Sequence, residues 1–219
     1  MQPALEISRP VWIRVYRIFF ALLTVAMIAY QIRESQGSGT LNVANFFSFF
    51  TIQSNILAAV VLLIGGSSLR FVQRPTTGWE MIRGAALIYM ATTGVVYGLL
   101  LADVDVQTNG LVNDVLHRII PIVMVADFLL QPFRHRITYR QALVWTIYPL
   151  VYLAYSLIRG PIVDWYPYPF LNPDKSGGYP GVAAYSVGIL IFFLVATWVI
   201  LAVAEWRRAK RASSPALPA

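Results

Sequence analysis

The stretch GVAAYSVGILIFFLVATWVILAVAEW, residues 181–206, decides the class of this protein, because it is long and almost wholly apolar. A helix needs about 20 apolar residues to cross the hydrocarbon core of a bilayer. The whole chain has 219 residues, of which 58% are hydrophobic and 12% are charged. Soluble domains carry roughly twice that share of charge. We therefore expect an integral membrane protein with little sequence left for a separate soluble domain.

Five further apolar stretches are separated by glycine-rich or polar turns. Together they predict an all-α, polytopic membrane protein with six transmembrane helices in one bundle, over residues 10–32, 44–64, 80–101, 111–130, 141–158 and 181–206. Thr77 with Glu80, and Thr138 with Gln141, have the spacing of capping boxes at two of the helix starts. The transmembrane domain would cover residues 1–206, and the basic residues 207–219 would form a disordered tail.

Basic residues accumulate in alternate loops, which predicts the orientation of the helices. Cytoplasmic loops of membrane proteins are enriched in Lys and Arg. Thirteen of the 17 basic residues fall at the N-terminus, in the second and fourth loops or in the tail, namely Arg9, Arg14, Arg17, Arg70, Arg74, Arg83, Arg134, Arg136, Arg140, Arg207, Arg208, Lys210 and Arg211. Both termini should therefore be cytoplasmic, and the net charge of +7 is explained by topology rather than by nucleic-acid binding.

The composition also excludes several kinds of chemistry. The chain contains no cysteine, which removes disulfides, thiolate nucleophiles and thiolate-bound metals. The two histidines, His117 and His135, are separated by a Gln131-Pro132 break, and both lysines lie outside the predicted spans. We expect no metal, haem, Schiff-base or other cofactor.

Polar residues inside the predicted spans concentrate in the second and fourth helices. The second contains Ser48, Thr51, Gln53, Ser54 and Asn55, with Ser48, Thr51 and Asn55 on one face of a continuous helix. The fourth contains a stripe of Asp114, His117, Arg118 and Pro121. Because polar groups in hydrocarbon are costly, they indicate a functional site. Counted from the outer helix ends, Thr51 and His117 lie at a similar depth, about 9–11 Å below the outer surface.

Other polar and aromatic residues are expected near the same depth. Tyr97 lies towards the outer end of the third helix, and the fifth helix and the loop that follows it contribute Tyr148, Tyr152, Tyr155, Arg159, Trp165 and Tyr168. The loop reads Trp165-Tyr-Pro-Tyr-Pro-Phe170, a stiff amphipathic segment suited to covering a pocket. The pattern predicts a pocket that opens towards the outer leaflet.

These residue types favour acyl-transfer chemistry. A threonine hydroxyl becomes a nucleophile when a base removes its proton, and His117 is the intramembrane base with a suitable ordinary pKa. Asp114 would orient the histidine as in serine-type triads, and Asn55 or Gln53 would donate to an oxyanion. Asp114 and Arg118 have the alternative of forming an ion pair with each other, and the tyrosines of the fifth helix have the alternative of simple packing.

Three features together resemble the androgen-induced-gene family of integral membrane proteins: the run FFTIQSN at residues 49–55, His117 followed by Pro121, and the core Tyr168-Pro-Phe170 of the loop. The family has a bacterial branch of this length and layout. The resemblance implies an enzyme of the cell membrane, bacterial inner membrane for this branch, that hydrolyses fatty acid esters of hydroxy fatty acids with Thr51 and His117. Its partners would be lipid substrates and the membrane.

Alternatives remain open at this point. The sequence is more polar after Thr51 than in the animal members of the family, so Ser54 is a competing nucleophile. A second function is a non-catalytic protein that binds or transports a lipid or small molecule, although no broken half-helix pair or internal repeat is evident. A third is a structural subunit whose polar stripes contact a partner helix. Convergence of Thr51 and His117 within about 3–4 Å would favour catalysis.

Overall fold

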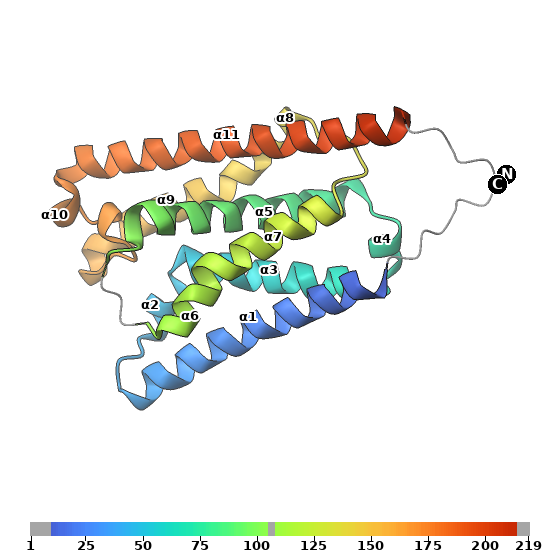
Figure 1. Cartoon of the computed structure of the whole chain (residues 1–219). Helices are drawn as coiled ribbons and strands as arrows, with labels where there is room; N and C mark the ends of the chain where they lie inside the picture. Colours follow the sequence, from blue (N-terminus) through green and yellow to red (C-terminus); the bar gives the residue numbers. More distant parts are fainter. Residues whose placement is uncertain (1–9, 105–107, 214–219) are drawn as a thin grey trace.

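The described residues, 10–104 and 108–213 of a computed structural model, form helices and loops, with no β-strand among them. The predicted all-α class is confirmed, and the long helices lie in one bundle (Figure 1). Four helical segments are long and apolar enough to cross a membrane: Val11–Gly37, Thr77–Leu101, Tyr139–Val163 and Gly178–Lys210. Such segments indicate a membrane protein.

These segments have internal structure. The first segment is α1 (Val11–Gly37), and the fourth belongs to α11 (Gly178–Ser213). The second segment consists of α5 (Thr77–Val96) and the π-helical turn η1 (Tyr97–Leu101). The third consists of α8 (Tyr139–Ala142), the 3₁₀ turn η3 (Leu143–Thr146) and α9 (Ile147–Val163). The short elements are α4 (Arg70–Gln73), η4 (Pro169–Leu171) and α10 (Pro173–Ser176). The expected disordered tail is partly wrong, because α11 continues through residues 207–213; residues 214–219 lie outside the described part.

The other two predicted spans are less regular. The second divides into α2 (Val43–Phe47) and the shorter apolar helix α3 (Phe50–Gly66). The fourth runs without a gap through α6 (Gly110–Asp114), the π-helical turn η2 (Val115–Ile119) and α7 (Ile120–Leu130), and it carries the charged residues Asp114, Arg118 and Asp127.

The continuous helix expected over residues 44–64 is wrong, because the chain leaves helical geometry between Ser48 and Phe50. Phe49 has φ −74° and ψ 126°, and α3 begins after it. Tyrosines of α9 bind the groups that this break exposes: Tyr152 donates to the Ser48 carbonyl at 2.9 Å, and the Tyr155 and Ser48 hydroxyls are 2.7 Å apart. Backbone groups inside a membrane need such partners, so α9 stabilises the interruption.

The π-helical turn η2 has a cause in the sequence. Pro121 has no N–H to donate to the His117 carbonyl four residues before it, so the regular α-helical ladder cannot continue there. The same proline packs against α5, where a Cβ added to Gly94 would lie 2.9 Å from Pro121 Cβ. A side chain at Gly94 would therefore push apart the two segments that carry Tyr97 and His117.

A buried ionic cluster joins α1, α5 and α7 near the end of the bundle at which α1 begins and α3 ends. Arg17 and Arg83 contact the two oxygens of Asp127 at 2.5 and 3.0 Å. All three side chains are at least nine-tenths buried, although the sequence had suggested that both arginines belong to cytoplasmic segments. Arg17 also donates to the Gly65 carbonyl of α3. The cluster ties four helices together.

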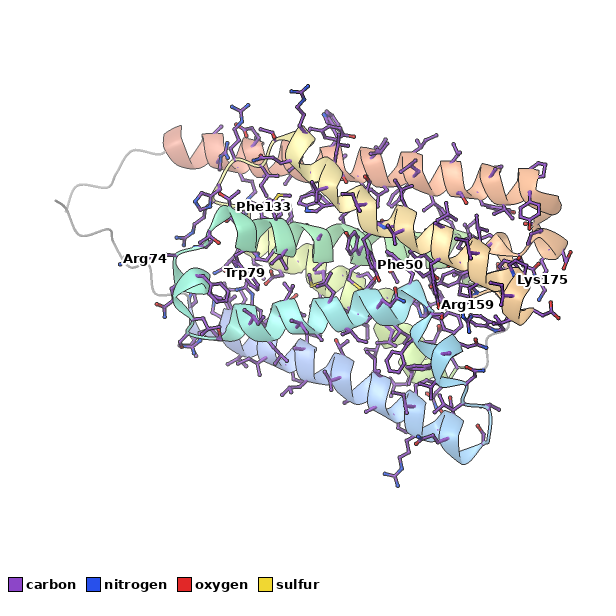
Figure 2. The ribbon with its side chains drawn as sticks, turned by 180° about the vertical axis from the view of Figure 1, so that it is seen from behind. Phe50, Arg74, Trp79, Phe133, Arg159 and Lys175 are labelled. Atoms are coloured by element: carbon purple, nitrogen blue, oxygen red, sulfur yellow. The ribbon has the colours of Figure 1, made fainter. Side chains whose placement is uncertain are left out.

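The two ends of the bundle differ in their residues. Arg74, Trp79 and Phe133 lie at one end, whereas Arg159 and Lys175 lie at the other, with Phe50 between the two ends (Figure 2). The predicted capping box at Thr138 and Gln141 is confirmed. The one at Thr77 is wrong: Thr76 caps α5, and the Glu80 carboxylate instead accepts from the backbone of the loop at Arg134 and His135.

Candidate functional site

Thr51 and His117 meet towards the end of the bundle that carries Arg159 and Lys175. Thr51 is the second residue of α3, directly after the helix break, and His117 lies in the π-helical turn η2. Thr51 Oγ1 and His117 Nε2 are 3.1 Å apart. The Thr51 residue is 5% exposed, and His117 is partly buried. The sequence expectation that the two polar helices converge is therefore met by hydrogen-bond geometry, while the roles of the two residues stay a prediction.

The other ring nitrogen determines which proton the histidine carries. His117 Nδ1 is 3.1 Å from the backbone carbonyl oxygen of Asn113, which can only accept. Nδ1 therefore holds the proton, and Nε2 is free to accept from the Thr51 hydroxyl. Tyr97 stacks on the imidazole with ring centroids 4.4 Å apart, and its hydroxyl accepts from Asn113 Nδ2 at 2.6 Å. The histidine is thus fixed in both position and tautomer.

Asp114 does not orient His117, contrary to the expected triad. Its carboxylate binds Arg118 at 2.5 Å, and both side chains are about half exposed. The alternative of an ion pair between the two is confirmed. Asn113 O, on the residue before Asp114, takes the place that the sequence had suggested for a carboxylate.

Tyr168 of the aromatic loop completes the contacts of the threonine. Its hydroxyl accepts from the Thr51 backbone N–H at 3.1 Å and lies 3.2 Å from Thr51 Oγ1. Because the Thr51 hydroxyl donates to His117, Tyr168 must be the donor to Thr51 Oγ1. Burial raises the pKa of the Tyr168 phenol, so this proton is in place at neutral pH. A directed chain of donors runs from Tyr168 through Thr51 to His117.

The polar residues that follow Thr51 have structural contacts. Asn55 Nδ2 donates to the carbonyls of Thr51 and Leu116, which joins α3 to η2. Gln53 donates to the Phe47 carbonyl at the helix break and accepts from Tyr148. Both N–H groups of Asn55 are therefore used by carbonyls, and Gln53 lines neither of the two cavities at Thr51, so the structure gives no support to the expected oxyanion role of these amides. The Ser54 hydroxyl is buried and has no hydrogen-bond partner.

The remaining predicted site residues surround this pair without contacting Thr51 Oγ1 or His117 Nε2. Ser48, Tyr152 and Tyr155 hold the helix break described above. Arg159 donates to the Asn45 side chain at 2.6 Å and lies over the Trp165 ring at 5.4 Å. Trp165 in turn contacts the ring of Phe49. These contacts attach the aromatic loop to α2 and to the break.

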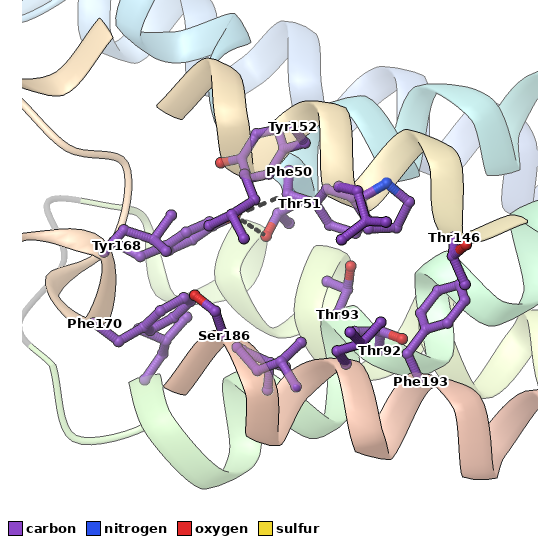
Figure 3. Close-up of a pocket in the computed structure, with 18 residues that line it drawn as sticks. Phe50, Thr51, Thr92, Thr93, Thr146, Tyr152, Tyr168, Phe170, Ser186 and Phe193 are labelled. Carbon is purple, nitrogen blue, oxygen red and sulfur yellow. Dashed lines mark hydrogen bonds between the residues drawn. The ribbon is translucent and has the colours of Figure 1, made fainter. Parts of the chain in front are cut away.

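Two cavities meet at Thr51. The outer cavity, of about 470 Å³, is lined by Thr51, His117, Asn113, Tyr97, the loop residues 165–169 and Lys175, among others. The inner pocket, of about 110 Å³, is mainly apolar and lies among α3, α5, α9 and α11 (Figure 3). Thr51 and Tyr168 line both spaces. The threonine hydroxyl therefore stands between the outer cavity, which is the more polar of the two, and the mainly apolar inner pocket.

Three hydroxyls on the wall of the inner pocket have no hydrogen-bond partner: those of Thr92, Thr93 and Ser186. Figure 3 shows Thr93 facing the same space as Thr51. Buried hydroxyls are normally satisfied, so this pocket offers unused hydrogen bonds to an occupant. Sequence reasoning missed these residues, and it also missed Asn113, whose position four residues before His117 in a helix was the available signal.

The arrangement can remove a proton from a hydroxyl beside an apolar pocket. No group of three or more His, Asp or Glu side chains able to hold a metal ion occurs in the described ranges, 10–104 and 108–213. Comparisons with protein-family models, with curated proteins and with solved structures find no match to this chain.

Proposed function

We propose that this protein is an intramembrane ester hydrolase in which Thr51 is the nucleophile and His117 the general base. The observation that carries the proposal is the 3.1 Å contact between Thr51 Oγ1 and His117 Nε2, with Nδ1 held by the Asn113 carbonyl. A nucleophile within hydrogen-bond reach of a base that a third group orients is the signature of covalent catalysis. The resemblance to the androgen-induced-gene family points to the same two residues.

The first half-reaction forms an acyl-threonine. His117 Nε2 takes the proton of the Thr51 hydroxyl while Oγ1 bonds to the ester carbonyl carbon, and the carbonyl electrons move to its oxygen. The Tyr168 hydroxyl is the donor closest to this oxygen, because it already lies 3.2 Å from Oγ1. When the intermediate collapses, the bond to the alcohol oxygen breaks, and that oxygen receives the proton from His117.

The second half-reaction uses water. His117 removes a proton from a water molecule whose oxygen attacks the acyl carbon. The bond to Thr51 Oγ1 then breaks, Oγ1 recovers a proton from His117, and the free carboxylic acid leaves. The outer cavity, which is larger and more polar than the inner pocket, is the route for water and for the alcohol product.

The substrate class follows from the surroundings of the pair. An ester at Thr51 would place its acyl part in the apolar inner pocket and its alcohol part in the outer cavity. Fatty acid esters of hydroxy fatty acids, which the family resemblance implies, have a long apolar chain on one side of the ester and a carboxylate on the other. Lys175 is a cation on the wall of the outer cavity, where such a carboxylate would lie.

We further propose that the chain crosses the membrane six times with both termini in the cytoplasm, in a bacterial inner membrane. In this arrangement α3 and the α6–η2–α7 segment cross with the four longer helices. The start of α1 and the end of α11 lie at the same end of the bundle (Figure 1), which suits an even number of crossings. Arg74 and Arg134 follow crossings that would end on this side, in keeping with the distribution of positive charge.

The test is hydrolysis of a panel of fatty acyl esters by the purified protein in detergent. Thr51→Ala and His117→Ala should each abolish turnover, since general-base catalysis alone contributes about 10²–10⁴-fold. Ser54→Ala is the matched control, because it removes a buried hydroxyl three residues away that has no partner. Full activity in Thr51→Ala, with the protein folded, would reject the proposal.

The alternative of a non-catalytic binding protein has one observation in its favour. The helix break between α2 and α3 faces a cavity of about 470 Å³, and interrupted helices also form binding sites in transporters. An intact lipid that copurifies with the protein, together with no hydrolysis across the ester panel, would favour this function.

A further inference from the structure

A third hollow lies on the outside of the bundle, between the end of α5 with η1 and the first half of α11. This groove has a volume of about 510 Å³. It is bounded on one side by Val95, Val96, Leu99 and Leu100, and on the other mainly by Gly181, Ala184, Gly188 and Ile189. Leu99 is 77% exposed, so in a membrane the groove opens to the acyl chains of the bilayer.

The groove adjoins the inner pocket. Val96 and Ile189 line both the groove and the inner pocket, and Thr51 lines both the inner pocket and the outer cavity. The groove therefore adjoins the inner pocket at Val96 and Ile189, and the inner pocket adjoins the outer cavity at Thr51. The inner pocket of about 110 Å³ is far below the roughly 300–1,000 Å³ of pockets that enclose whole small molecules, so a long acyl chain at Thr51 needs further apolar space, which the adjoining groove offers.

We propose that the acyl chain of the ester enters sideways from the bilayer through this groove and reaches Thr51 by way of the inner pocket. The proposal rests on the proposed function, and it names the route and the place of the chain. The partnerless hydroxyls of Thr92 and Thr93, 6% and 5% exposed, give independent support. A chain that follows this route brings its ester oxygens past unused hydrogen-bond donors in the inner pocket.

Small residues of α11 keep the groove open. Gly181, Ala184 and Gly188 are spaced three and four residues apart and so share one face of the helix. A Cβ added to Gly188 would meet no atom within 4 Å. No neighbouring side chain therefore requires glycine at this position, and a larger residue there would fill the groove without disturbing the packing of α11.

The experiment compares Gly188→Leu with Gly98→Leu on two substrates, an acetyl ester and a palmitoyl ester of the same alcohol. Gly98 is the matched control, because its added Cβ also meets nothing within 4 Å and it does not line the groove. Gly188→Leu should lower kcat/KM for the palmitoyl ester about tenfold or more, as expected when an apolar site rejects a chain. The acetyl ester should be cleaved at the wild-type rate by both variants.

An equal loss on both esters, or no loss on the palmitoyl ester, would overturn the groove while leaving the hydrolase proposal intact. Failure of the wild type to cleave either ester would reject the hydrolase instead. Photolabelling, which does not depend on catalysis, tests the route separately from the hydrolase proposal. Palmitic acid with a photoreactive diazirine at its chain end should label residues 181–192 in Thr51→Ala. Excess palmitate should reduce this labelling. Labelling elsewhere, or labelling of this segment that palmitate does not reduce, would overturn the route and indicate an ordinary bilayer contact.

Discussion

At the scale of single residues, the site depends on the direction of the hydrogen bonds among Tyr168, Thr51 and His117. Because the Asn113 carbonyl fixes the proton on His117 Nδ1, Thr51 donates to Nε2 and Tyr168 donates to Thr51. In this structure the Tyr168 hydroxyl donates its hydrogen bond to Thr51 Oγ1. When an ester is bound, the same proton can turn to the carbonyl oxygen as charge develops there.

Tyr168→Phe tests this role. The substitution keeps the ring that stacks on Phe170 and removes the hydroxyl, so we expect kcat to fall about 10²-fold, the usual loss of one oxyanion donor. KM should change little, because the interaction strengthens in the transition state. The measurement is steady-state hydrolysis of a palmitoyl ester. A change confined to KM would show that Tyr168 serves binding only.

The sequence identified Thr51, His117 and Tyr168 as neighbours, but not the orienting group. A carboxylate one turn before a histidine is a reasonable triad partner, and Asp114 has that position. The structure instead pairs Asp114 with Arg118 on the exposed side of the helix. A backbone carbonyl leaves no signature in residue type, so the available signal for Asn113 O was its position four residues before His117 in a helix.

At the scale of secondary-structure elements, the contact between Thr51 and His117 depends on two irregularities. The break before α3 places Thr51 at a helix start, and the π-helical turn η2 carries His117. Hydrophobic periodicity locates a helix but is insensitive to a short interruption, which is why residues 44–64 were expected to be continuous. Pro121 was visible in the sequence and explains the second irregularity; the first depends on tyrosines of α9, about 100 residues away.

Tyr152→Phe tests how α9 stabilises the break. It leaves the Ser48 carbonyl without its 2.9 Å partner, and an unsatisfied buried group costs about 1–3 kcal/mol. We expect a lower midpoint of thermal unfolding in detergent micelles. Tyr30→Phe is the control, since Tyr30 is 48% exposed on α1 and should leave the midpoint unchanged. Equal midpoints for both variants would mean that the break needs no support from the Tyr152 hydroxyl.

At the scale of the whole molecule, the buried ionic cluster of Arg17, Arg83 and Asp127 lies at one end of the bundle, and the candidate site lies towards the other. Hydrophobicity alone predicted the all-helical class and the approximate places of the four segments that are long enough to cross a membrane. It could not predict that Arg17 and Arg83 are buried, because single arginines near helix ends usually reach the membrane surface. Their burial depends on Asp127, which lies more than 40 residues away from each in the chain.

Asp127→Asn should destabilise the bundle strongly. Two buried guanidinium groups would lose their charge partner, and breaking a buried ion pair costs about 3–5 kcal/mol. Asp114→Asn makes the same chemical change in the exposed pair with Arg118, where we expect about 1 kcal/mol or less. The free energy of unfolding, measured by denaturant titration in micelles, should separate the two variants. Similar small losses would show that the buried cluster does not stabilise the fold.

The orientation can be measured directly because the chain has no cysteine. Ser38→Cys follows α1 and Ser68→Cys follows α3, and both positions are exposed. In intact bacterial cells, a maleimide that cannot cross the inner membrane should label Ser38→Cys and not Ser68→Cys. The reverse pattern would place the termini outside, and labelling of both would mean that α3 does not cross.

The central claim is that Thr51 is a nucleophile activated by His117, and covalent trapping tests it most directly. A fluorophosphonate with a long alkyl chain is incubated with the purified protein, and the modified residue is identified by peptide mass spectrometry. We predict one adduct, on Thr51, that is lost in His117→Ala and kept in Ser54→Ala. An adduct on Ser54, or equal labelling of Thr51 without His117, would contradict the account.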